Sequence, residues 1–445
     1  MITPIDQTLR APEAVLPMDP AAEYPRKVYV ELTTRCNLRC RMCVKHAHGS
    51  CIEEGDLPLA FMQRLAPSLA HTRFLVLNGI GEPLLHPQLE EMIGLGRAMM
   101  PPEGTIGFQS NGLLLDRQRA RRLLAAGLDT LCLSLDSLGP VAGGEHHPSP
   151  VQQAVGHLAA ARRQSRRPLR LGLEVVLRRT TLSQLPAIID WAHGHGVDYI
   201  IASHLFSYDG ALEAESLFNP NSAEATALFA TWSRAAASQG LNLADLPAIP
   251  LKFVKSEADR RLLEIGAAMQ REAREQGLSL HFANLCASVD RRCEEAAACF
   301  HRARRLADDY GIDLTLPPLQ APVDNGRSCP FMAEQAVFIA HNGEVMPCHF
   351  LWHTYTCMVN QGAIQVQAQS FGNIAEQPLE AIWRDPRFRA FRAEATGSDY
   401  APCWSCPSGP CADLVVPNLL GMSDCYGNQV PCGHCMWSLG WTRCL

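Results

Sequence analysis

Three cysteines spaced C-x3-C-x2-C stand in the loop Cys36-Asn37-Leu38-Arg39-Cys40-Arg41-Met42-Cys43. It directly follows residues 28–33, a run of apolar and β-branched residues that predicts a strand. Three thiolates on one short loop cannot close a tetrahedral zinc site, and they leave one iron of a cubane cluster without a cysteine. The loop therefore predicts an iron–sulfur cluster with one open metal corner, where a ligand can bind.

A zinc knuckle is the main alternative for this loop. Its fourth ligand would lie elsewhere, with His46 and His48 the nearest candidates, and three buried thiols are a further alternative. Zinc knuckles favour paired C-x2-C units, whereas this loop holds one such pair and a single further cysteine. The spacing alone favours the iron–sulfur interpretation slightly, and the surrounding motifs favour it strongly.

The composition limits the classes of protein to consider. A chain of 445 residues exceeds the length at which one core stops growing, so two or more domains are expected. The formal charge of −6 argues against nucleic acid as a partner, because phosphate binding needs a basic face. No secretory signal or membrane-spanning run is evident, so we expect a cytoplasmic protein with no membrane partner. Eighteen cysteines in such a chain favour metal binding over disulfides.

Short β-branched runs alternate with helical stretches over the first half of the chain, which is the pattern of βα units around a parallel sheet. The expected strands cover residues 28–33, 73–78, 105–110, 130–135, 169–177 and 199–203. In parallel α/β folds, functional residues gather at the carboxyl ends of the strands. We therefore expect the site in the loops that follow these strands.

Polar motifs follow three of the expected strands in succession. After the second strand comes Asn78-Gly79-Ile80-Gly81-Glu82-Pro83, in which glycines allow close backbone approach to a ligand beside a carboxylate. Ser110-Asn111-Gly112 follows the third strand, and Ser134-Leu135-Asp136 follows the fourth. Each motif alone could be an ordinary turn or a solvated carboxylate. Their joint occurrence at successive strand ends favours one shared ligand site.

Together with the cysteine loop, these motifs resemble the radical S-adenosylmethionine (radical SAM) superfamily. The resemblance implies a partial (βα)6 barrel and a [4Fe–4S] cluster on Cys36, Cys40 and Cys43, whose open iron binds S-adenosylmethionine. It also implies reductive cleavage of S-adenosylmethionine to a 5′-deoxyadenosyl radical, which abstracts hydrogen from the substrate. An electron donor such as flavodoxin or ferredoxin is an implied partner.

The resemblance further implies contacts to S-adenosylmethionine. Glu82 lies in the equivalent of the family's Gly-Gly-Glu-Pro motif, which binds the amino group of the methionine moiety, and Ile80 replaces the first glycine. Met42 replaces an aromatic residue near adenine, a role that a soft thioether can fill. The implied cofactor-binding residues are Met42, Gly81, Glu82, Pro83, Ser110, Asn111 and Asp136. No catalytic residue is assigned, and His204 at the end of the sixth strand receives no role.

The sequence changes character between about residues 205 and 316. The expected helices here cover residues 222–239, 257–276 and 289–309. Gly277 and Gly311 each follow a helix and precede an alternating apolar run, which predicts further helix–strand units beside the barrel. Cys286, Cys293 and Cys299 match no ligand spacing, so core thiols are favoured over a metal site.

Beyond a proline-rich linker at 317–327, the cysteine density rises, with ten of the eighteen cysteines in the last 117 residues. A small, loop-rich unit held together by metal is expected. Its Gly-x4-Cys and C-x2-C-x4-C groups, with Gly-Asn-Ile at 372–374 and Ile-Trp at 382–383, resemble the SPASM extension of radical SAM enzymes, which binds up to two auxiliary [4Fe–4S] clusters. The candidate ligands are Cys329, Cys348, Cys403, Cys406, Cys411, Cys425, Cys432, Cys435 and Cys444.

The spacing departs from the SPASM pattern after Cys406, so it leaves open which cysteine serves which of one or two auxiliary clusters. Without Cys357, which fits no pattern, nine cysteines are available for the eight positions of two full clusters. The extra thiol could be structural or could donate hydrogen in a radical reaction. Paired zinc ribbons are the alternative for this region taken alone.

The expected fold class is therefore α/β: a partial radical SAM barrel with a helical or αβ insertion and a small cysteine-rich domain. The expected divisions are an N-terminal segment at 1–23, the barrel at 24–205, the insertion and linker at 206–327, and the SPASM-like domain at 328–445.

The chain most resembles protein and metalloenzyme maturases of this group, including those associated with tungsten oxidoreductases, so a protein or peptide substrate is expected. Residues 1–27 are too few for a leader-peptide-binding domain, which favours a folded protein or a small molecule. One alternative is a small-molecule dehydrogenase or epimerase with the same radical chemistry. The other is a non-catalytic iron–sulfur or zinc scaffold, which would not cleave S-adenosylmethionine.

Overall fold

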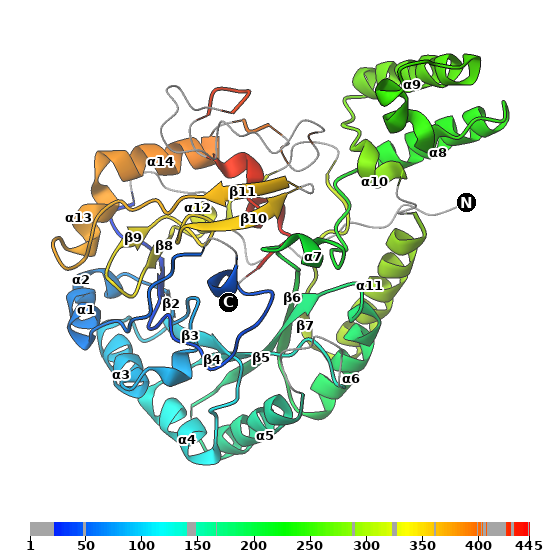
Figure 1. The fold of residues 1–445 in the computed structure, drawn as a ribbon. Helices are drawn as coiled ribbons and strands as arrows, with labels where there is room; N and C mark the ends of the chain where they lie inside the picture. Colours follow the sequence, from blue (N-terminus) through cyan, green and yellow to red (C-terminus); the bar gives the residue numbers. More distant parts are fainter. Residues whose placement is uncertain are drawn as a thin grey trace.

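The protein is described by a computed structural model, whose centre is a curved sheet with helices along its outer side (Figure 1). The described residues are 22–47, 50–139, 148–165, 167–286, 290–322, 327–359, 362–397, 399–401, 403, 406, 424–428, 431–443 and 445. The strands of the sheet are β1 (Lys27–Val30), β2 (Phe74–Val76), β3 (Thr105–Ser110), β4 (Thr130–Ser134), β5 (Arg170–Leu177), β6 (Tyr199–His204), β7 (Asp313–Thr315), β8 (Ala336–Ile339) and β9 (Val345–Met346).

All six expected strands are present as β1 to β6, and each pairs in parallel with its neighbour in the chain. The expected α/β fold class is thereby confirmed. The sheet nevertheless has nine strands, in the order β7-β6-β5-β4-β3-β2-β1-β8-β9. Strand β7 extends it in parallel beside β6, β8 extends it in parallel beside β1, and β9 is antiparallel to β8. Two segments distant in sequence thus complete the barrel wall.

The outer helices follow their strands in the βα pattern. They are α1 (Leu59–Arg64), α2 (Ala66–Leu69), α3 (Leu89–Met99), α4 (Arg117–Ala126), α5 (Pro148–Gln164), α6 (Leu185–Gly194) and α11 (Asp290–Tyr310). Helix α4 shows how the local sequence determines where a helix begins and ends. Asp116 caps its first turn by accepting a hydrogen bond from Arg119 N at 2.6 Å, and Gly127 ends it with φ +108°. Leu123 and Leu124 on its inner face are buried in the main core.

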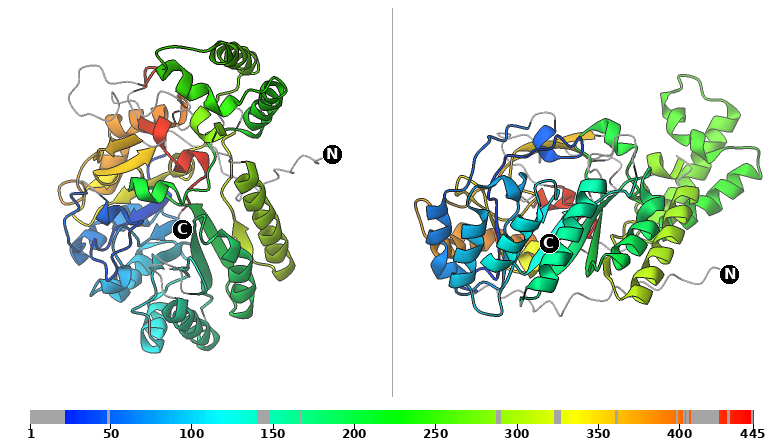
Figure 2. Two further views of the ribbon diagram at one scale, coloured as in Figure 1. Left: turned by 45° about the vertical axis from the view of Figure 1, so that its right-hand side comes forward. Right: turned by 90° about the horizontal axis from the view of Figure 1, so that it is seen from below.

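The inside of the barrel is occupied by the C-terminal segment (Figures 1 and 2). His204 N donates to Trp441 O at 2.8 Å, and Arg443 N donates to Ser203 Oγ at 3.0 Å. Tyr29 on β1 then donates its hydroxyl to Leu445 O at 3.1 Å. A cavity of about 880 Å³ lies beside Leu445 at the amino ends of the strands. The polar motifs of the sequence lie at the opposite, carboxyl ends.

A helical unit with its own hydrophobic core projects from the barrel (Figures 1 and 2). It contains α8 (Ala223–Ala237), α9 (Glu257–Glu275) and α10 (Phe282–Cys286), whereas the short helix α7 (Gly210–Glu213) lies at the barrel, near β10. The strand expected after Gly277 is absent, because Leu278 and Leu280 pack into this separate core and the chain enters α10. The strand expected after Gly311 is present as β7. That part of the sequence prediction was therefore wrong for the first joint and correct for the second.

The C-terminal region packs against the β1 edge of the barrel. Its elements are α12 (Pro330–Ala333), β8, β9, the antiparallel pair β10 (Tyr355–Val359) and β11 (Gly362–Val366), α13 (Leu379–Arg384) and α14 (Pro386–Gly397). Trp383, Phe338 and Val28 all belong to one hydrophobic core, which is continuous from this region into the barrel. A shared core fixes the C-terminal cysteines relative to the strand ends.

Candidate active site and cysteine clusters

The cysteine loop leaves β1 at the carboxyl edge of the sheet. A backbone hydrogen bond from Cys43 N to Cys40 O, 3.0 Å long, closes its last turn. Lys45 stabilises the loop through a hydrogen bond from its Nζ to Thr34 O at 2.7 Å. Cys36, Cys40 and Cys43 are all partly exposed. Burial raises the pKa of the Cys36 thiol.

The second motif lies directly against the chain that enters this loop. Gly81 N donates to Thr33 O at 3.2 Å, and Glu82 N donates to Arg35 O at 2.8 Å. A Cβ atom at position 81 would lie 2.2 Å from Thr33 O, so only glycine permits this approach. The motif after β2 is therefore held beside Cys36 through backbone contacts.

The carboxylate of Glu82 is buried where the motifs meet. It accepts hydrogen bonds from Leu84 N at 3.0 Å, Ser110 Oγ at 2.7 Å and Asn111 N at 2.8 Å. Burial raises the pKa of Glu82, and these hydrogen bonds act in the opposite direction. A carboxylate offers about four acceptor positions, so one stays available to a cationic ligand such as an ammonium group. The arrangement fits the amino group of S-adenosylmethionine.

Asn111 links the motif after β3 to the cysteine loop. Its Nδ2 donates to Asn37 Oδ1 at 2.8 Å, and its Oδ1 accepts from Leu113 N at 3.0 Å. The structure thus brings together three of the four segments singled out in the sequence: the cysteine loop, the Glu82 motif and the Ser110-Asn111 motif.

The remaining predicted contacts lie around this centre. Met42 is partly buried within the cysteine loop, and Pro83 begins the short 3-10 helix Pro83–Leu85. Asp136 is buried after β4, where its Oδ1 accepts from Val176 N at 3.0 Å and ties β4 to β5. His204 Nε2 lies 2.8 Å from Pro318 O, and burial lowers the pKa of this histidine to about 4. Its backbone N–H contacts the C-terminal segment at Trp441, and its ring lies edge-on to Phe218.

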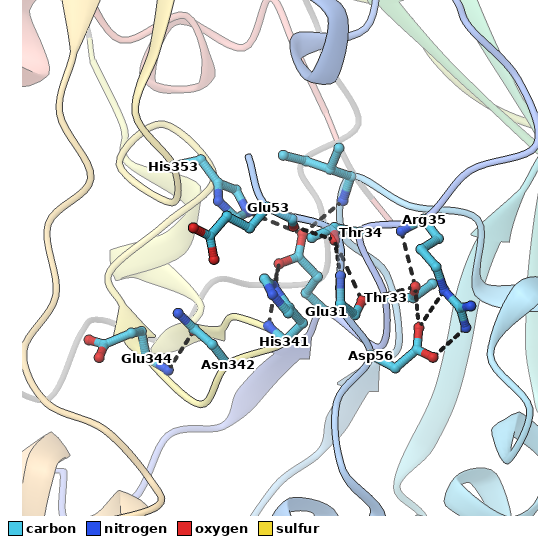
Figure 3. Close-up of polar contacts among 12 residues, drawn as sticks. Glu31, Thr33, Thr34, Arg35, Glu53, Asp56, His341, Asn342, Glu344 and His353 are labelled. Carbon is cyan, nitrogen blue, oxygen red and sulfur yellow. Dashed lines mark hydrogen bonds and ion pairs between the residues drawn. The ribbon is translucent and has the colours of Figure 1, made fainter. Parts of the chain in front are cut away.

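Sequence reasoning missed a buried cluster beside the site, formed by Glu31, His341 and His353 (Figure 3). Glu31 directly follows β1, at the same edge of the sheet as the cysteine loop, and is fully buried. Its carboxylate lies 3.3 Å from His341 Nδ1 and 3.1 Å from His353 Nε2. Burial opposes ionisation, but the hydrogen bonds from both histidines outweigh it and lower the pKa of Glu31 to about 2. A glutamate within an apolar strand run was the available signal, because a buried carboxylate requires partners.

Four of the C-terminal cysteines lie near one another. Burial raises the pKa of Cys329, Cys348 and Cys432, and the neighbouring Cys435 raises each of them further. Arg327 adds a positive charge beside this group and donates to the carbonyl of Cys432. Within the described ranges no three His, Cys, Asp or Glu side chains converge closely enough to hold a metal ion, so the thiols are neighbours without closed ligand geometry.

The other candidate cysteines differ in burial, and Cys403 lies against the residue that follows Cys432. Cys403 is buried with its Sγ facing Gly433, Cys406 is partly exposed and Cys425 is exposed. Cys411 and Cys444 lie outside the described residues, as does the side chain of Cys293. Cys357 is buried within β10, and the Cys299 thiol donates to Leu182 O at 3.2 Å. Cys286 is partly exposed at the end of α10.

Two protein families match the chain. Residues 30–192 match the radical SAM superfamily, and residues 329–407 match the SPASM iron–sulfur cluster-binding domain. The protein is therefore a radical SAM enzyme with a SPASM domain. Its cofactors are a [4Fe–4S] cluster, S-adenosylmethionine and auxiliary iron–sulfur clusters, as the sequence analysis expected.

The chain is also similar to individual proteins of known name. The chain is 24% identical over 420 residues to the tungsten-containing aldehyde ferredoxin oxidoreductase cofactor-modifying protein of Pyrococcus furiosus. The aligned region covers 92% of this chain and 94% of that protein. It is 28% identical over 216 residues to a PqqA peptide cyclase of Streptomyces rochei, covering 47% and 56% of the two chains. The solved structure of Streptococcus suis SuiB bound to S-adenosylmethionine aligns with a TM-score of 0.49 and 14% identity, covering 86% of this chain and 71% of that one.

No helix in the described part of the chain combines the length and the apolar character needed to cross a membrane.

Proposed function

We propose that this enzyme is a maturase that modifies a metalloenzyme, or the cofactor bound to one, by radical chemistry. The observation that supports the proposal is the similarity to the cofactor-modifying protein of Pyrococcus furiosus, which extends over nearly the whole of both chains. We place its action in the cytoplasm, with a flavodoxin or ferredoxin as electron donor. The substrate is then a macromolecule rather than a free metabolite.

We propose that Cys36, Cys40 and Cys43 hold the [4Fe–4S] cluster. When bound, the cluster and S-adenosylmethionine supply one-electron reductive cleavage and hydrogen abstraction. Glu82 accepts a hydrogen bond from the amino group of S-adenosylmethionine through its remaining acceptor position. Ser110 and the Asn111 backbone fix that carboxylate from the β3 side.

Four further residues have supporting parts in this proposal. Gly81 and Pro83 keep the Glu82 backbone against the entry to the cysteine loop, since Gly81 N donates to Thr33 O. We assign Met42, on the cysteine loop, to the adenine, and Asp136, which follows β4, to the ribose. These assignments rest on the matching positions of the family motifs.

We propose that one auxiliary cluster is held by the neighbouring group Cys329, Cys348, Cys432 and Cys435. Four thiols are the number that a fully ligated [4Fe–4S] cluster requires. The charge of Arg327 beside them would favour the anionic cluster. Cys403, Cys406 and Cys425, with Cys411 and Cys444, remain the candidates for a second cluster. The proposed divisions of the chain are the barrel at 24–205, the insertion at 206–327 and the auxiliary domain at 328–445, and the two later divisions add α11, β7, β8 and β9 to the barrel.

Cys435→Ala is expected to lower the iron content by about four atoms per chain, the content of one cubane cluster. It should also lower the melting temperature, because metal binding stabilises a small cysteine-rich unit. Iron per chain, measured after anaerobic reconstitution, tests this. The matched control is Cys357→Ala, which removes another buried thiol and should leave the iron content unchanged. Unchanged iron in Cys435→Ala would remove this residue from the ligands.

The experiment that tests the proposed function measures 5′-deoxyadenosine formed anaerobically by the reduced enzyme in the presence of fractionated host extract. Stimulation by the macromolecular fraction, abolished by protease treatment of that fraction, is the expected result. Stimulation by the small-molecule fraction alone would contradict a maturase and support a dehydrogenase or epimerase.

A further inference from the structure

The buried carboxylate of Glu31 joins three segments that are far apart in the sequence (Figure 3). Its Oε1 accepts a hydrogen bond from Ile80 N at 3.0 Å and lies 3.1 Å from His353 Nε2. Its Oε2 accepts from His341 N and lies near His341 Nδ1, both at 3.3 Å. The barrel strand β1, the motif after β2 and the C-terminal region therefore meet at one side chain.

The approach of the β2 motif to Glu31 is close. A Cβ atom at Gly79 would lie 2.4 Å from Glu31 Cγ, so a larger residue there would displace the carboxylate. Ile80 occupies the position where the radical SAM family usually has a glycine, and its N–H is used by Glu31. Two residues further along, Glu82 enters the candidate site for S-adenosylmethionine. Glu31 thus fixes the backbone immediately before the cofactor-binding residues.

The two histidines come from the region that carries the auxiliary cysteines. His341 lies in the turn between β8 and β9, and His353 lies five residues after Cys348. Their side chains are largely shielded, with 15% and 12% exposure, against 0% for Glu31. An ionised carboxylate buried to this extent is held only while its hydrogen-bond partners stay in place. The position of the auxiliary region is therefore coupled to that of Glu31.

We propose that Glu31, His341 and His353 form a positioning network. The network fixes residues 79–83 in the conformation that binds S-adenosylmethionine, and it does so only while the auxiliary domain is in place. The inference rests on the proposed role of Glu82. None of the three residues touches the cofactor in this account. They act through Ile80 and the backbone that follows it.

The physical effect of the network is pre-organisation. When the segment is already fixed, binding does not have to supply the free energy needed to order it. Loss of one charge-assisted hydrogen bond to Glu31 is expected to weaken binding of S-adenosylmethionine about ten-fold. The rate at saturating S-adenosylmethionine should change less than two-fold, because the reacting groups are unchanged.

The test compares two replacements of one histidine in the cluster-reconstituted enzyme. His353→Leu removes the donor to Glu31, whereas His353→Gln retains an N–H that can reach it. The dissociation constant of S-adenosylmethionine is measured from its effect on the electron paramagnetic resonance spectrum of the reduced cluster. We expect a rise of about ten-fold in His353→Leu and a near-normal value in His353→Gln, with equal iron content in both. A simple loss of packing would not be rescued by glutamine.

Glu344→Gln is the matched control, because Glu344 lies in the same turn as His341 but contacts Ser370 and Asn373 instead of Glu31. It should bind S-adenosylmethionine normally. If His353→Leu fails to fold, Glu31→Gln provides the second variant, since it retains an acceptor for Ile80 N and removes the charge that holds the histidines. It too should bind about ten-fold more weakly.

Wild-type affinity in the folded histidine variant, or in Glu31→Gln, would overturn the inference. A wild-type enzyme whose cluster spectrum does not respond to S-adenosylmethionine would instead overturn the proposed function. The two failures are therefore distinguishable in one series of spectra.

Discussion

Cys40→Ala is expected to abolish cleavage of S-adenosylmethionine, with a fall of at least about 1,000-fold in 5′-deoxyadenosine formation. The reason is that Cys40 is the middle thiol of a loop that offers only three cysteines, so no fourth is present to replace it. The variant should lose about four irons per chain and keep those of the auxiliary domain. Iron content and anaerobic product formation, measured on the same preparation, test both parts.

The control for this variant is Cys51→Ala, which removes an exposed thiol close to the loop in sequence. It should retain full activity and full iron content. Substantial cleavage by Cys40→Ala would contradict the assignment of the cysteine loop. Loss of all iron would show that the loop and the auxiliary cysteines do not hold separate clusters.

Glu82→Ala is expected to weaken binding of S-adenosylmethionine by about 100-fold. It should also lower the free energy of unfolding by about 3 kcal/mol, because Leu84 N, Ser110 Oγ and Asn111 N would lose their common acceptor in a buried site. Equilibrium binding to the reduced enzyme and anaerobic urea unfolding give the two values.

Glu91→Gln provides the comparison, since Glu91 is an exposed carboxylate on α3 that accepts a hydrogen bond from Gln88 Nε2 at 3.0 Å. Neither the affinity for S-adenosylmethionine nor the free energy of unfolding should change in Glu91→Gln. If Glu82→Ala loses stability but binds S-adenosylmethionine normally, Glu82 is a structural carboxylate and the contact to the amino group is wrong.

The sequence predicted the elements that depend on local patterns. The run at 28–33 and the five later apolar runs became β1 to β6, because alternating apolar and β-branched residues fit a parallel sheet wherever helices cover it. Strand β8 was not predicted, since Ala336–Ile339 lies between cysteines in a region interpreted as metal-held loops. Leu278 and Leu280 have the same alternation as a strand but are buried in a helical core. Pattern alone could not distinguish those two environments.

In the site too, contacts between motifs at neighbouring strand ends could be predicted, whereas contacts between segments far apart in the sequence could not. The cysteine loop, Glu82, Ser110 and Asn111 could be predicted as neighbours, because the carboxyl ends of consecutive parallel strands lie on one edge. The partners of Glu31 could not, since His341 and His353 lie 310 and 322 positions away in the chain. The grouping of Cys329 and Cys348 with Cys432 and Cys435 likewise depends on how the C-terminal region folds against the barrel. Cysteine spacing in the sequence left that grouping open.

Radical S-adenosylmethionine chemistry is tested by measuring 5′-deoxyadenosine and methionine formed from S-adenosylmethionine by the anaerobic, cluster-reconstituted enzyme after reduction. We expect equal amounts of both products from the wild-type enzyme, and neither product from Cys40→Ala under the same conditions. Intact S-adenosylmethionine in the wild-type sample, with the cluster shown to be present and reduced, would contradict a radical SAM enzyme and leave an iron–sulfur scaffold as the explanation.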